Sequence, residues 1–93
     1  MYQLRITSQF KKDLKKLKKR KRDFELTTKV LRILQLKGAH GIPGRMKPHR
    51  LSGNYSDTWE CHIKPDLLIL WIQFETPKII RLVRIGSHSQ LFK

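Results

Sequence analysis

Four histidines and an aspartate are the side chains in this 93-residue sequence whose types suit proton transfer. An imidazole has an ordinary pKa of about 6.5, so it can act as an acid or as a base near neutral pH. His49 lies in the segment KPHRL, His62 and Asp66 lie in CHIKPD, and His88 follows a Gly-Ser pair. His40 stands in a basic loop, where a histidine is usually only solvated, and we assign it no role. The other four residues are candidates for acid–base chemistry.

Three segments in the second half of the chain predict the strands that position these candidates. Residues 58–64 alternate between apolar and polar side chains, which predicts a strand with one buried and one open face, and His62 falls on the open face. The continuously apolar segment 67–74 suits the centre of a sheet. Residues 79–85 form the last expected strand, and His88 lies just past its end. Successive strands joined by short turns are antiparallel, so one edge of the sheet can collect these side chains.

The first half of the chain predicts one strand and two helices. Residues 2–7 alternate between apolar and polar types, as in a short strand. Ser8 can cap a following helix, whose apolar side chains recur at helical spacing. Asp23 is the capping candidate of a second helix, and Gly38 is expected to end it. Residues 39–48 contain several glycines and prolines, which predicts a loop.

This order of elements predicts an α+β protein, in which an N-terminal strand and a helical hairpin pack on a small antiparallel sheet. The length fits one domain, residues 1–93. The single cysteine, Cys61, excludes an intramolecular disulfide and fits a reducing compartment. No apolar run is long enough to span a bilayer, and no secretory signal is visible. We therefore expect a cytoplasmic protein with no membrane partner.

The charge of the chain is strongly and unevenly positive. Lys and Arg number 21 against 7 Asp and Glu, which gives +14, and residues 11–22 hold nine basic residues with Asp13 as the only acid. Same-sign pairs one turn apart destabilise a helix, and a polyanion would relieve that repulsion. We therefore favour a nucleic acid or an acidic protein as partner over a purely solubilising role. The expected binding residues on this helix are Lys15, Lys16, Lys18 and Lys19.

RNA cleavage is a reaction that these residues could perform. Cleavage without a metal needs a base for the 2′-hydroxyl, an acid for the leaving 5′-oxygen and cations for the charged transition state. Histidines suit both proton-transfer roles. Cations beside the predicted strands could hold phosphates and an aromatic ring could stack on a base; these candidates are Arg50, Lys64, Arg81, Arg84 and Phe92.

A metal site is the competing use of histidine and cysteine. Cys61 and His62 are adjacent on a predicted strand and would point to opposite faces of the sheet. The sequence has no Cys-x-x-Cys or His-x-x-x-His spacing, no phosphate-binding glycine motif and no Gly-x-Ser-x-Gly. We therefore expect no metal and no cofactor.

Three separated segments resemble a known family in order and spacing. KPHRLSG, WECHIKPDLLILW and RIGSHSQLF are similar to segments of the YafQ-type toxins of the RelE/ParE superfamily, which belong to bacterial type II toxin–antitoxin systems. The resemblance implies a RelE-like toxin fold and a ribosome-associated endoribonuclease that cleaves mRNA (an mRNA interferase). It also implies contacts with ribosomal RNA and neutralisation by an acidic, partly disordered antitoxin.

The same resemblance implies roles for individual residues. The catalytic work would fall on His49, His62, Asp66 and His88, with Phe92 as a supporting aromatic. Acid–base cleavage of this kind leaves a 2′,3′-cyclic phosphate or 3′-phosphate and a 5′-hydroxyl. Leu67 departs from the pattern, because YafQ-like toxins can carry an aromatic residue directly after the aspartate.

Two other functions would also explain a basic chain. A non-catalytic RNA- or ribosome-binding module needs cations but has no need of His62, Asp66 and His88 together at one end of a sheet. A DNA-binding role is less favoured, because the helical hairpin offers no short polar recognition helix. The histidines therefore favour the enzyme.

Overall fold

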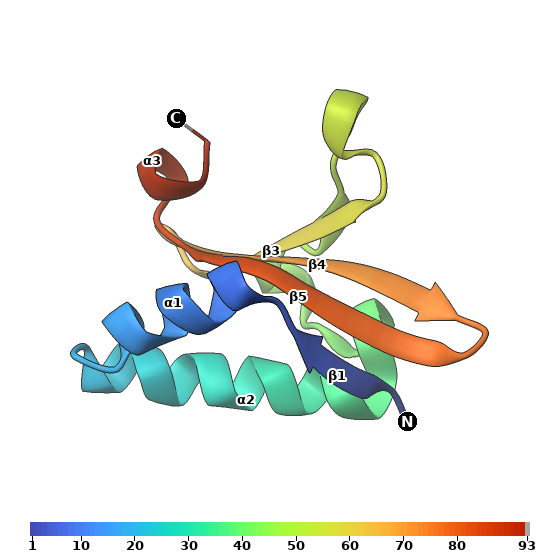
Figure 1. Cartoon of the computed structure of the whole chain (residues 1–93), viewed down its shortest axis with the longest axis horizontal. Coiled ribbons are helices and arrows are strands. Elements are labelled where there is room, and N and C mark those ends of the chain that lie inside the picture. Colours follow the sequence, from blue (N-terminus) through green and yellow to red (C-terminus); the bar gives the residue numbers. More distant parts are fainter. Residues whose placement is uncertain (93) are drawn as a thin grey trace.

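The structure is a computed structural model, and it describes residues 1–92. A short N-terminal strand leads into two helices, and the rest of the chain is mainly strands (Figure 1). The elements are β1 (Gln3–Ile6), α1 (Ser8–Leu17), α2 (Lys21–Lys37), β2 (His49–Arg50), β3 (Thr58–Lys64), β4 (Leu67–Glu75), β5 (Lys78–Gly86) and α3 (His88–Leu91), with the 3₁₀ turns η1 (Gly38–Gly41), η2 (Gly44–Met46) and η3 (Gly53–Tyr55).

The five strands form one mixed sheet in the order β1-β5-β4-β3-β2. Strands β2 to β5 pair antiparallel, as their short connections predict. The first strand, β1, pairs with β5 in parallel, with Leu4 opposite Ile80. The α+β class is thus confirmed, but the sheet is mixed rather than antiparallel throughout. The direction of β1 escaped the sequence pattern because β1 and β5 lie near opposite ends of the chain, where no short turn sets their relative direction.

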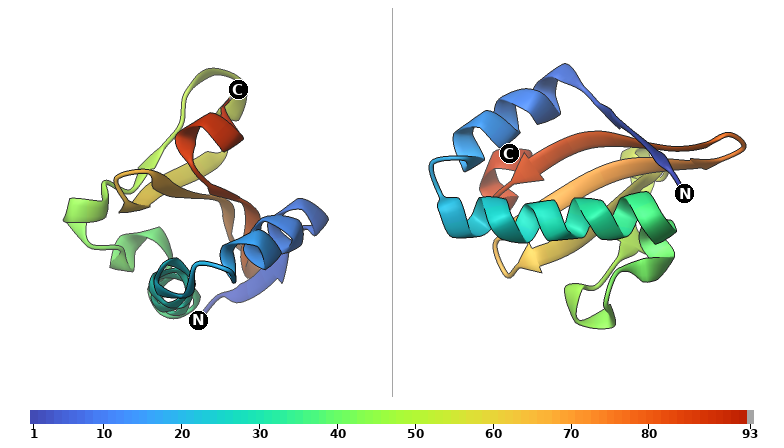
Figure 2. Two further views of the ribbon diagram at one scale, coloured as in Figure 1. Left: turned by 90° about the vertical axis from the view of Figure 1, so that its left-hand side faces the viewer. Right: turned by 90° about the horizontal axis from the view of Figure 1, so that it is seen from below.

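Helices α1 and α2 cover one face of the sheet (Figure 2), and α3 and η3 rise from the opposite face (Figure 1). The core between helices and sheet includes Phe10, Leu34 and Trp71, none of which exposes measurable surface. Strand β4 lies between β3 and β5, which explains its unbroken apolar run. Its Leu68 and Leu70 alternate with core residues, so they line the face that carries α3 and η3.

The helix ends differ slightly from the expected ones. Thr7, rather than Ser8, caps α1: its Oγ1 accepts a hydrogen bond from Phe10 N–H and donates one to the carbonyl of Leu82 in β5. Helix α2 begins at Lys21, before the expected cap Asp23. It ends at Gly38 as expected, where φ is +70° and an added Cβ would lie 2.8 Å from the Tyr2 ring.

Two elements beside the site were not expected from the sequence. The two-residue strand β2 pairs His49 with Glu60 of β3. The single-turn helix α3 carries His88 and is held by a capping box, in which Ser87 and Gln90 each bond the other's backbone N–H. Within residues 1–92, no helix has the length and apolar character needed to cross a bilayer.

Candidate active site

A buried glutamate connects two of the candidate histidines. Glu60 Oε1 lies 3.4 Å from His49 Nε2 and 3.5 Å from His62 Nε2. The pairing of β2 with β3 brings His49 opposite Glu60, and His62 follows two residues later on the same face of β3. The Glu60 side chain is 10% exposed, whereas those of His49 and His62 are 48% and 34% exposed. This His49–Glu60–His62 cluster is therefore anchored by a buried carboxylate and open to solvent through its imidazoles.

Both imidazoles of this cluster have a backbone carbonyl near Nδ1. His49 Nδ1 lies 2.8 Å from the carbonyl oxygen of Lys47, and His62 Nδ1 lies 3.4 Å from that of Pro65. A carbonyl oxygen only accepts, so each contact is a hydrogen bond when Nδ1 carries the proton. The Glu60 carboxylate also only accepts, so each Nε2 contact is a hydrogen bond only when Nε2 carries a proton. The two contacts of one ring are therefore hydrogen bonds together only when that ring is protonated.

A second group forms where β5 ends. Asp66 Oδ1 accepts a hydrogen bond from the backbone N–H of His88 at 3.0 Å, so this carboxylate fixes the start of α3. The ring of Phe92 lies 5.1 Å from the imidazole of His88 and 6.1 Å from the ring of Tyr55. His88 itself is exposed. We name Asp66, His88, Phe92 and Tyr55 the α3 cluster.

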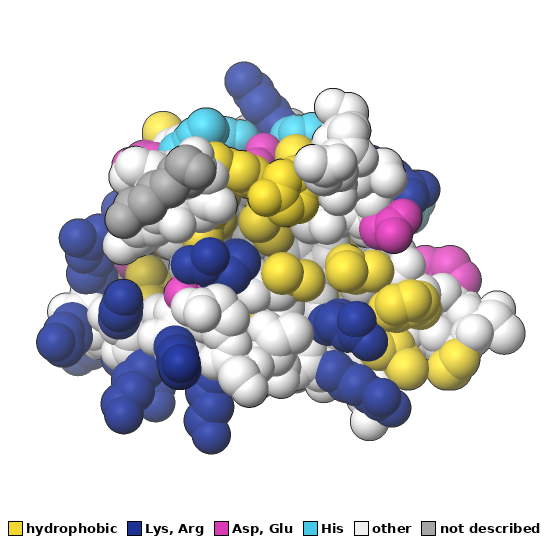
Figure 3. Space-filling view, turned by 45° about the horizontal axis from the view of Figure 1, so that its top comes forward, with side chains coloured by type: hydrophobic (Ala, Val, Ile, Leu, Met, Phe, Trp, Pro, Cys, Tyr) yellow, Lys and Arg dark blue, Asp and Glu magenta, His cyan; other side chains and the backbone are white. Residues whose placement is uncertain are grey.

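The two clusters lie along one rim of the molecule. In the space-filling view, histidine side chains gather along this rim with an acidic side chain and apolar surface between them (Figure 3). The short turn between β3 and β4 connects His62 to Asp66. The structure thus brings His49 to His62 and Asp66 to His88, and it places His40 apart, in η1 after α2.

Two of the expected RNA-binding cations have carboxylate partners inside the chain. Lys64 Nζ lies 2.7 Å from Asp23 Oδ1, which fastens β3 to α2. Arg84 Nε lies 2.8 Å from Asp13 Oδ2, which fastens β5 to α1. Part of the charge of Lys64 and of Arg84 is therefore already neutralised by a carboxylate of the same chain.

The other expected cations are more accessible. Arg81 lies over the ring of Phe74 at 5.7 Å, and Arg50 donates a hydrogen bond to the carbonyl of Ser56. The four lysines expected on α1 and at its end are exposed, and in the described chain none lies in an ion pair with a carboxylate: Lys15, Lys16, Lys18 and Lys19. Their charges are therefore available to an anionic partner.

Glu60 and Tyr55 are site residues that the sequence reasoning missed. Glu60 shares the period-two face of β3 with His62, which is a signal for it, but its contact with His49 depends on β2. Tyr55 lies in an irregular segment, and no sequence pattern connects it to Phe92. Burial, with a smaller contribution from Glu60, raises the pKa of Cys61 to about 12, so this thiol does not serve as a nucleophile at neutral pH.

The family of this chain follows from its sequence and its fold together. Residues 2–93 match the family model of the YafQ bacterial toxin of type II toxin–antitoxin systems. The chain belongs to the YafQ toxin family. It is 29% identical over 89 residues to the mRNA interferase toxin YafQ of Escherichia coli K12, covering 96% of this chain and 94% of that protein.

Solved structures of bacterial toxins share the fold of this chain. YafQ in the E. coli DinJ–YafQ toxin–antitoxin complex is 25% identical, with a TM-score of 0.85, and the match covers 99% of this chain and 98% of that one. A metal-bound toxin from Helicobacter pylori is 38% identical, with a TM-score of 0.83, and the match covers 99% of this chain and all of that one. Among the described residues of this YafQ-family chain, no three His, Cys, Asp or Glu side chains form a group that could hold a metal ion.

One position departs from the expected YafQ-type site. Leu67 follows Asp66 directly, and its side chain is 5% exposed and packs into the hydrophobic core. It presents no surface on which a base could stack. Any aromatic stacking at this site would therefore come from the α3 cluster.

Proposed function

We propose that this YafQ-family toxin is an endoribonuclease that cleaves mRNA on the ribosome by metal-independent acid–base catalysis. The observation that carries the proposal is the buried Glu60 carboxylate between Nε2 of His49 and Nε2 of His62. The E. coli relative with which this chain shares nearly its whole length is an mRNA interferase. A binding module would have no use for such a proton-exchanging arrangement.

The reaction needs two proton transfers. One imidazole of the site accepts the proton of the 2′-hydroxyl, and the resulting oxygen attacks the adjacent phosphorus. The bond from phosphorus to the 5′-oxygen breaks, and that oxygen takes a proton from a second, protonated imidazole. The products are a 2′,3′-cyclic phosphate and a 5′-hydroxyl. Glu60 offsets the positive charge on whichever neighbouring ring is protonated.

The α3 cluster has a positioning role as well as a chemical one. Asp66 holds the backbone at His88, which sets where that imidazole lies relative to the sheet. The ring of Phe92 lies beside those of His88 and Tyr55, and these rings could stack with an unpaired base. Arg50 and Arg81 are exposed cations on the strands, and the α1 lysines are suited to ribosomal RNA or to the antitoxin.

The partners follow from the family. E. coli YafQ forms a complex with the antitoxin DinJ. We propose that an acidic antitoxin likewise neutralises this chain, whose net charge is +14. The site of action is the bacterial cytoplasm, where ribosomes translate mRNA.

The products of cleavage test the proposed mechanism. We expect cleavage in a translating extract to persist when a chelator removes transition metals but leaves the magnesium that ribosomes need. Mapping of the fragments should show 2′,3′-cyclic phosphate or 3′-phosphate ends and 5′-hydroxyl ends. Loss of cleavage that zinc, copper or manganese restores, or fragments with 5′-phosphate ends, would contradict acid–base attack by the 2′-hydroxyl.

Replacing Glu60 by Gln tests the role of the shared carboxylate. A hydrogen bond to a charged group contributes about 1.5–3 kcal/mol, so its loss in the transition state should slow cleavage about 10- to 100-fold. Glu75→Gln is the matched control, because this exposed glutamate contacts Tyr2 and Gln73 rather than a histidine. Equal rates for the Glu60 and Glu75 variants, measured by single-turnover cleavage, would remove Glu60 from the mechanism.

A further inference from the structure

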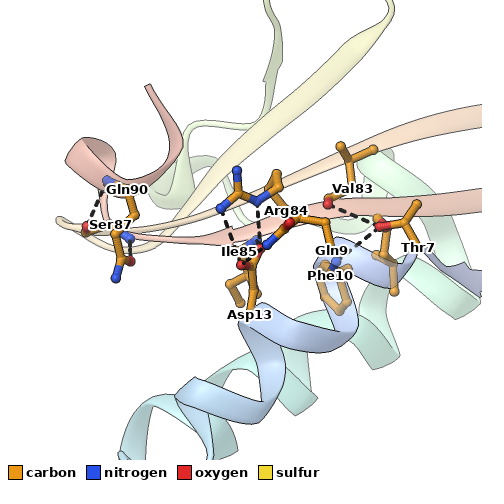
Figure 4. A network of polar contacts seen from close by, with 10 residues as sticks. Thr7, Gln9, Phe10, Asp13, Val83, Arg84, Ile85, Ser87 and Gln90 are labelled. Carbon is orange, nitrogen blue, oxygen red and sulfur yellow. Dashed lines mark hydrogen bonds and ion pairs between the residues drawn. The ribbon is translucent and has the colours of Figure 1, made fainter. Parts of the chain in front are cut away.

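A polar hollow of about 390 Å³ lies between α1 and the end of β5, away from the His49–Glu60–His62 cluster. Its charged wall consists of Lys16, Arg20, Arg84 and Asp13. Ser87 and Gln90 complete the side that faces α3. Figure 4 shows how Asp13 and Arg84 meet beside the capping box of α3. The proposed proton transfers use none of the residues that line this hollow.

The hollow is suited to an anion. Three cations and one carboxylate line it, so its formal charge is 3 − 1 = +2. The carboxylate is already occupied: Asp13 accepts hydrogen bonds from Gln9, from Nε and Nη2 of Arg84, and from the backbone N–H of Ile85. Lys16 and Arg20 are exposed and have no carboxylate partner in the part of the chain that the structure describes.

Some hydrogen-bond donors of the hollow are held in place by contacts within the chain. Asp13 fixes two of the three guanidinium nitrogens of Arg84, which leaves the third free to donate. Gln90 Oε1 accepts from Ser87 N–H at 2.8 Å, so the amide nitrogen of Gln90 keeps both of its hydrogens for a ligand. Fixed donors beside two mobile cations suit the several oxygens of a phosphate.

The position of the hollow connects it to the proposed site. Ser87 of the hollow immediately precedes His88, and Leu67 of the hollow immediately follows Asp66. Asp66 and His88 are themselves joined by a hydrogen bond of 3.0 Å. An RNA strand that continues from His88 past Ser87 toward α1 would therefore reach the hollow that Lys16 and Arg20 line.

We propose that this hollow binds a non-scissile backbone phosphate of the substrate RNA. The inference rests on the proposed function, because it takes the RNA cleaved at the histidines as the ligand. Proximity to His88 favours the substrate strand over an acidic side chain of a protein partner. Lys16 and Arg20 would hold the phosphate, while Arg84 and Gln90 would orient it.

Binding of an RNA that cannot be cleaved tests the proposal. The probe is a fluorescent 2′-O-methyl oligoribonucleotide, whose blocked 2′-oxygen cannot attack, and its affinity for the full chain is measured by anisotropy. Lys16→Gln with Arg20→Gln should weaken binding about tenfold and reduce the slope of log K against log salt by about 0.7, the value for one phosphate on a single strand. The matched control is Lys11→Gln with Lys12→Gln, which removes the same charge from exposed positions of α1 that do not line the hollow.

A second measurement identifies the phosphate itself. Single linkages of the probe are replaced in turn by neutral methylphosphonates. A methylphosphonate at one position of the probe should weaken its binding to the wild-type chain. The same methylphosphonate should not weaken binding to the Lys16/Arg20 variant any further, because the two changes remove the same contact. The proposal would be overturned if the Lys16/Arg20 variant and the control variant lost RNA affinity equally. It would also be overturned if no methylphosphonate position behaved in this way. A Lys16/Arg20 variant that binds RNA normally and the antitoxin weakly would overturn it as well.

These outcomes are separable from a failure of the proposed function. The probe is never cleaved, so a wrong assignment of the catalytic histidines leaves its affinity unchanged. Conversely, a chain without the phosphate contact would still produce 2′,3′-cyclic phosphate ends, but more slowly at low RNA concentration.

Discussion

Alanine at His88 or at His62 should each slow RNA cleavage by about 10²- to 10⁴-fold, the usual loss when a general acid or base is removed. The two imidazoles belong to different clusters along the same rim, and each is accessible to an RNA strand. The rates are measured by single-turnover cleavage of mRNA in a translating extract, with mapping of the fragment ends. A double variant that still cleaves mRNA and still inhibits growth would contradict the catalytic roles of His62 and His88.

The controls separate chemistry from binding and folding. Ribosome affinity should barely change, because each substitution removes one imidazole from a chain with 21 basic residues. Stability should also hold, because neither side chain is buried. His40→Ala, in η1, should leave the rate unchanged. A thermal melt of every variant shows whether a slow variant is folded, and Glu60→Gln supplies an independent test of the same mechanism.

The elements that the sequence predicted well are those with a strong local signal. The alternation in residues 58–64 gave the bounds of β3 because its apolar side chains face the core. The expected open face is only partly open, since Thr58 and Glu60 are buried and His62 and Lys64 are not. Gly38 marked the end of α2, because its positive φ disfavours other residues. The apolar run from Leu67 gave the central strand. In each case a few neighbouring residues determine the structure.

Contacts between residues that are far apart in the chain could not be predicted from local sequence patterns. Asp13 and Arg84 are 71 residues apart in the chain, and Lys64 and Asp23 are 41 apart. Cation type and density predicted Lys64 and Arg84 as RNA contacts but did not predict their carboxylate partners, because a sequence does not show which charges pair on folding. The parallel placement of β1 escaped prediction for the same reason.

The candidate site contains some residues whose positions the sequence predicted and others whose contacts it did not predict. The positions of His62 on an open strand face and of His88 past the end of β5 followed from periodicity. The buried link from Glu60 to His49 did not, because β2 is only two residues long and carries no pattern of its own. Asp66 was expected to act in the chemistry, and its contact with the His88 backbone adds a positioning role.

The Asp13–Arg84 pair joins the cationic helix to the strand that leads to His88, and it therefore contributes to stability. Burial alone would raise the pKa of Asp13, but hydrogen bonds from Arg84, Ile85 and Gln9 outweigh burial, and the pKa is lowered. A folded-state pKa below the unfolded value contributes stability at pH values above the unfolded pKa. That contribution is lost as the pH falls through the lowered folded-state pKa.

Asp13→Asn should therefore destabilise the protein at neutral pH. Breaking a buried ion pair costs about 3–5 kcal/mol, and because Arg84 is partly exposed here we expect about 2–3 kcal/mol. For a domain of this size that loss lowers the melting temperature by about 10–20 °C. The matched control is Asp23→Asn, whose partner Lys64 is 46% exposed against 29% for Arg84, and its effect should be smaller.

The pH dependence of the melting temperature then shows whether the charge of Asp13 accounts for the loss of stability in this variant. The wild type should lose stability as the pH falls below about 4, the range in which an unfolded aspartate takes up its proton. The Asp13→Asn variant has no carboxylate to protonate there, so its melting temperature should approach that of the wild type as the pH falls. A constant difference between the two proteins from pH 7 to pH 2 would show that the substitution acts through packing, and that the charge of Asp13 does not hold α1 to β5.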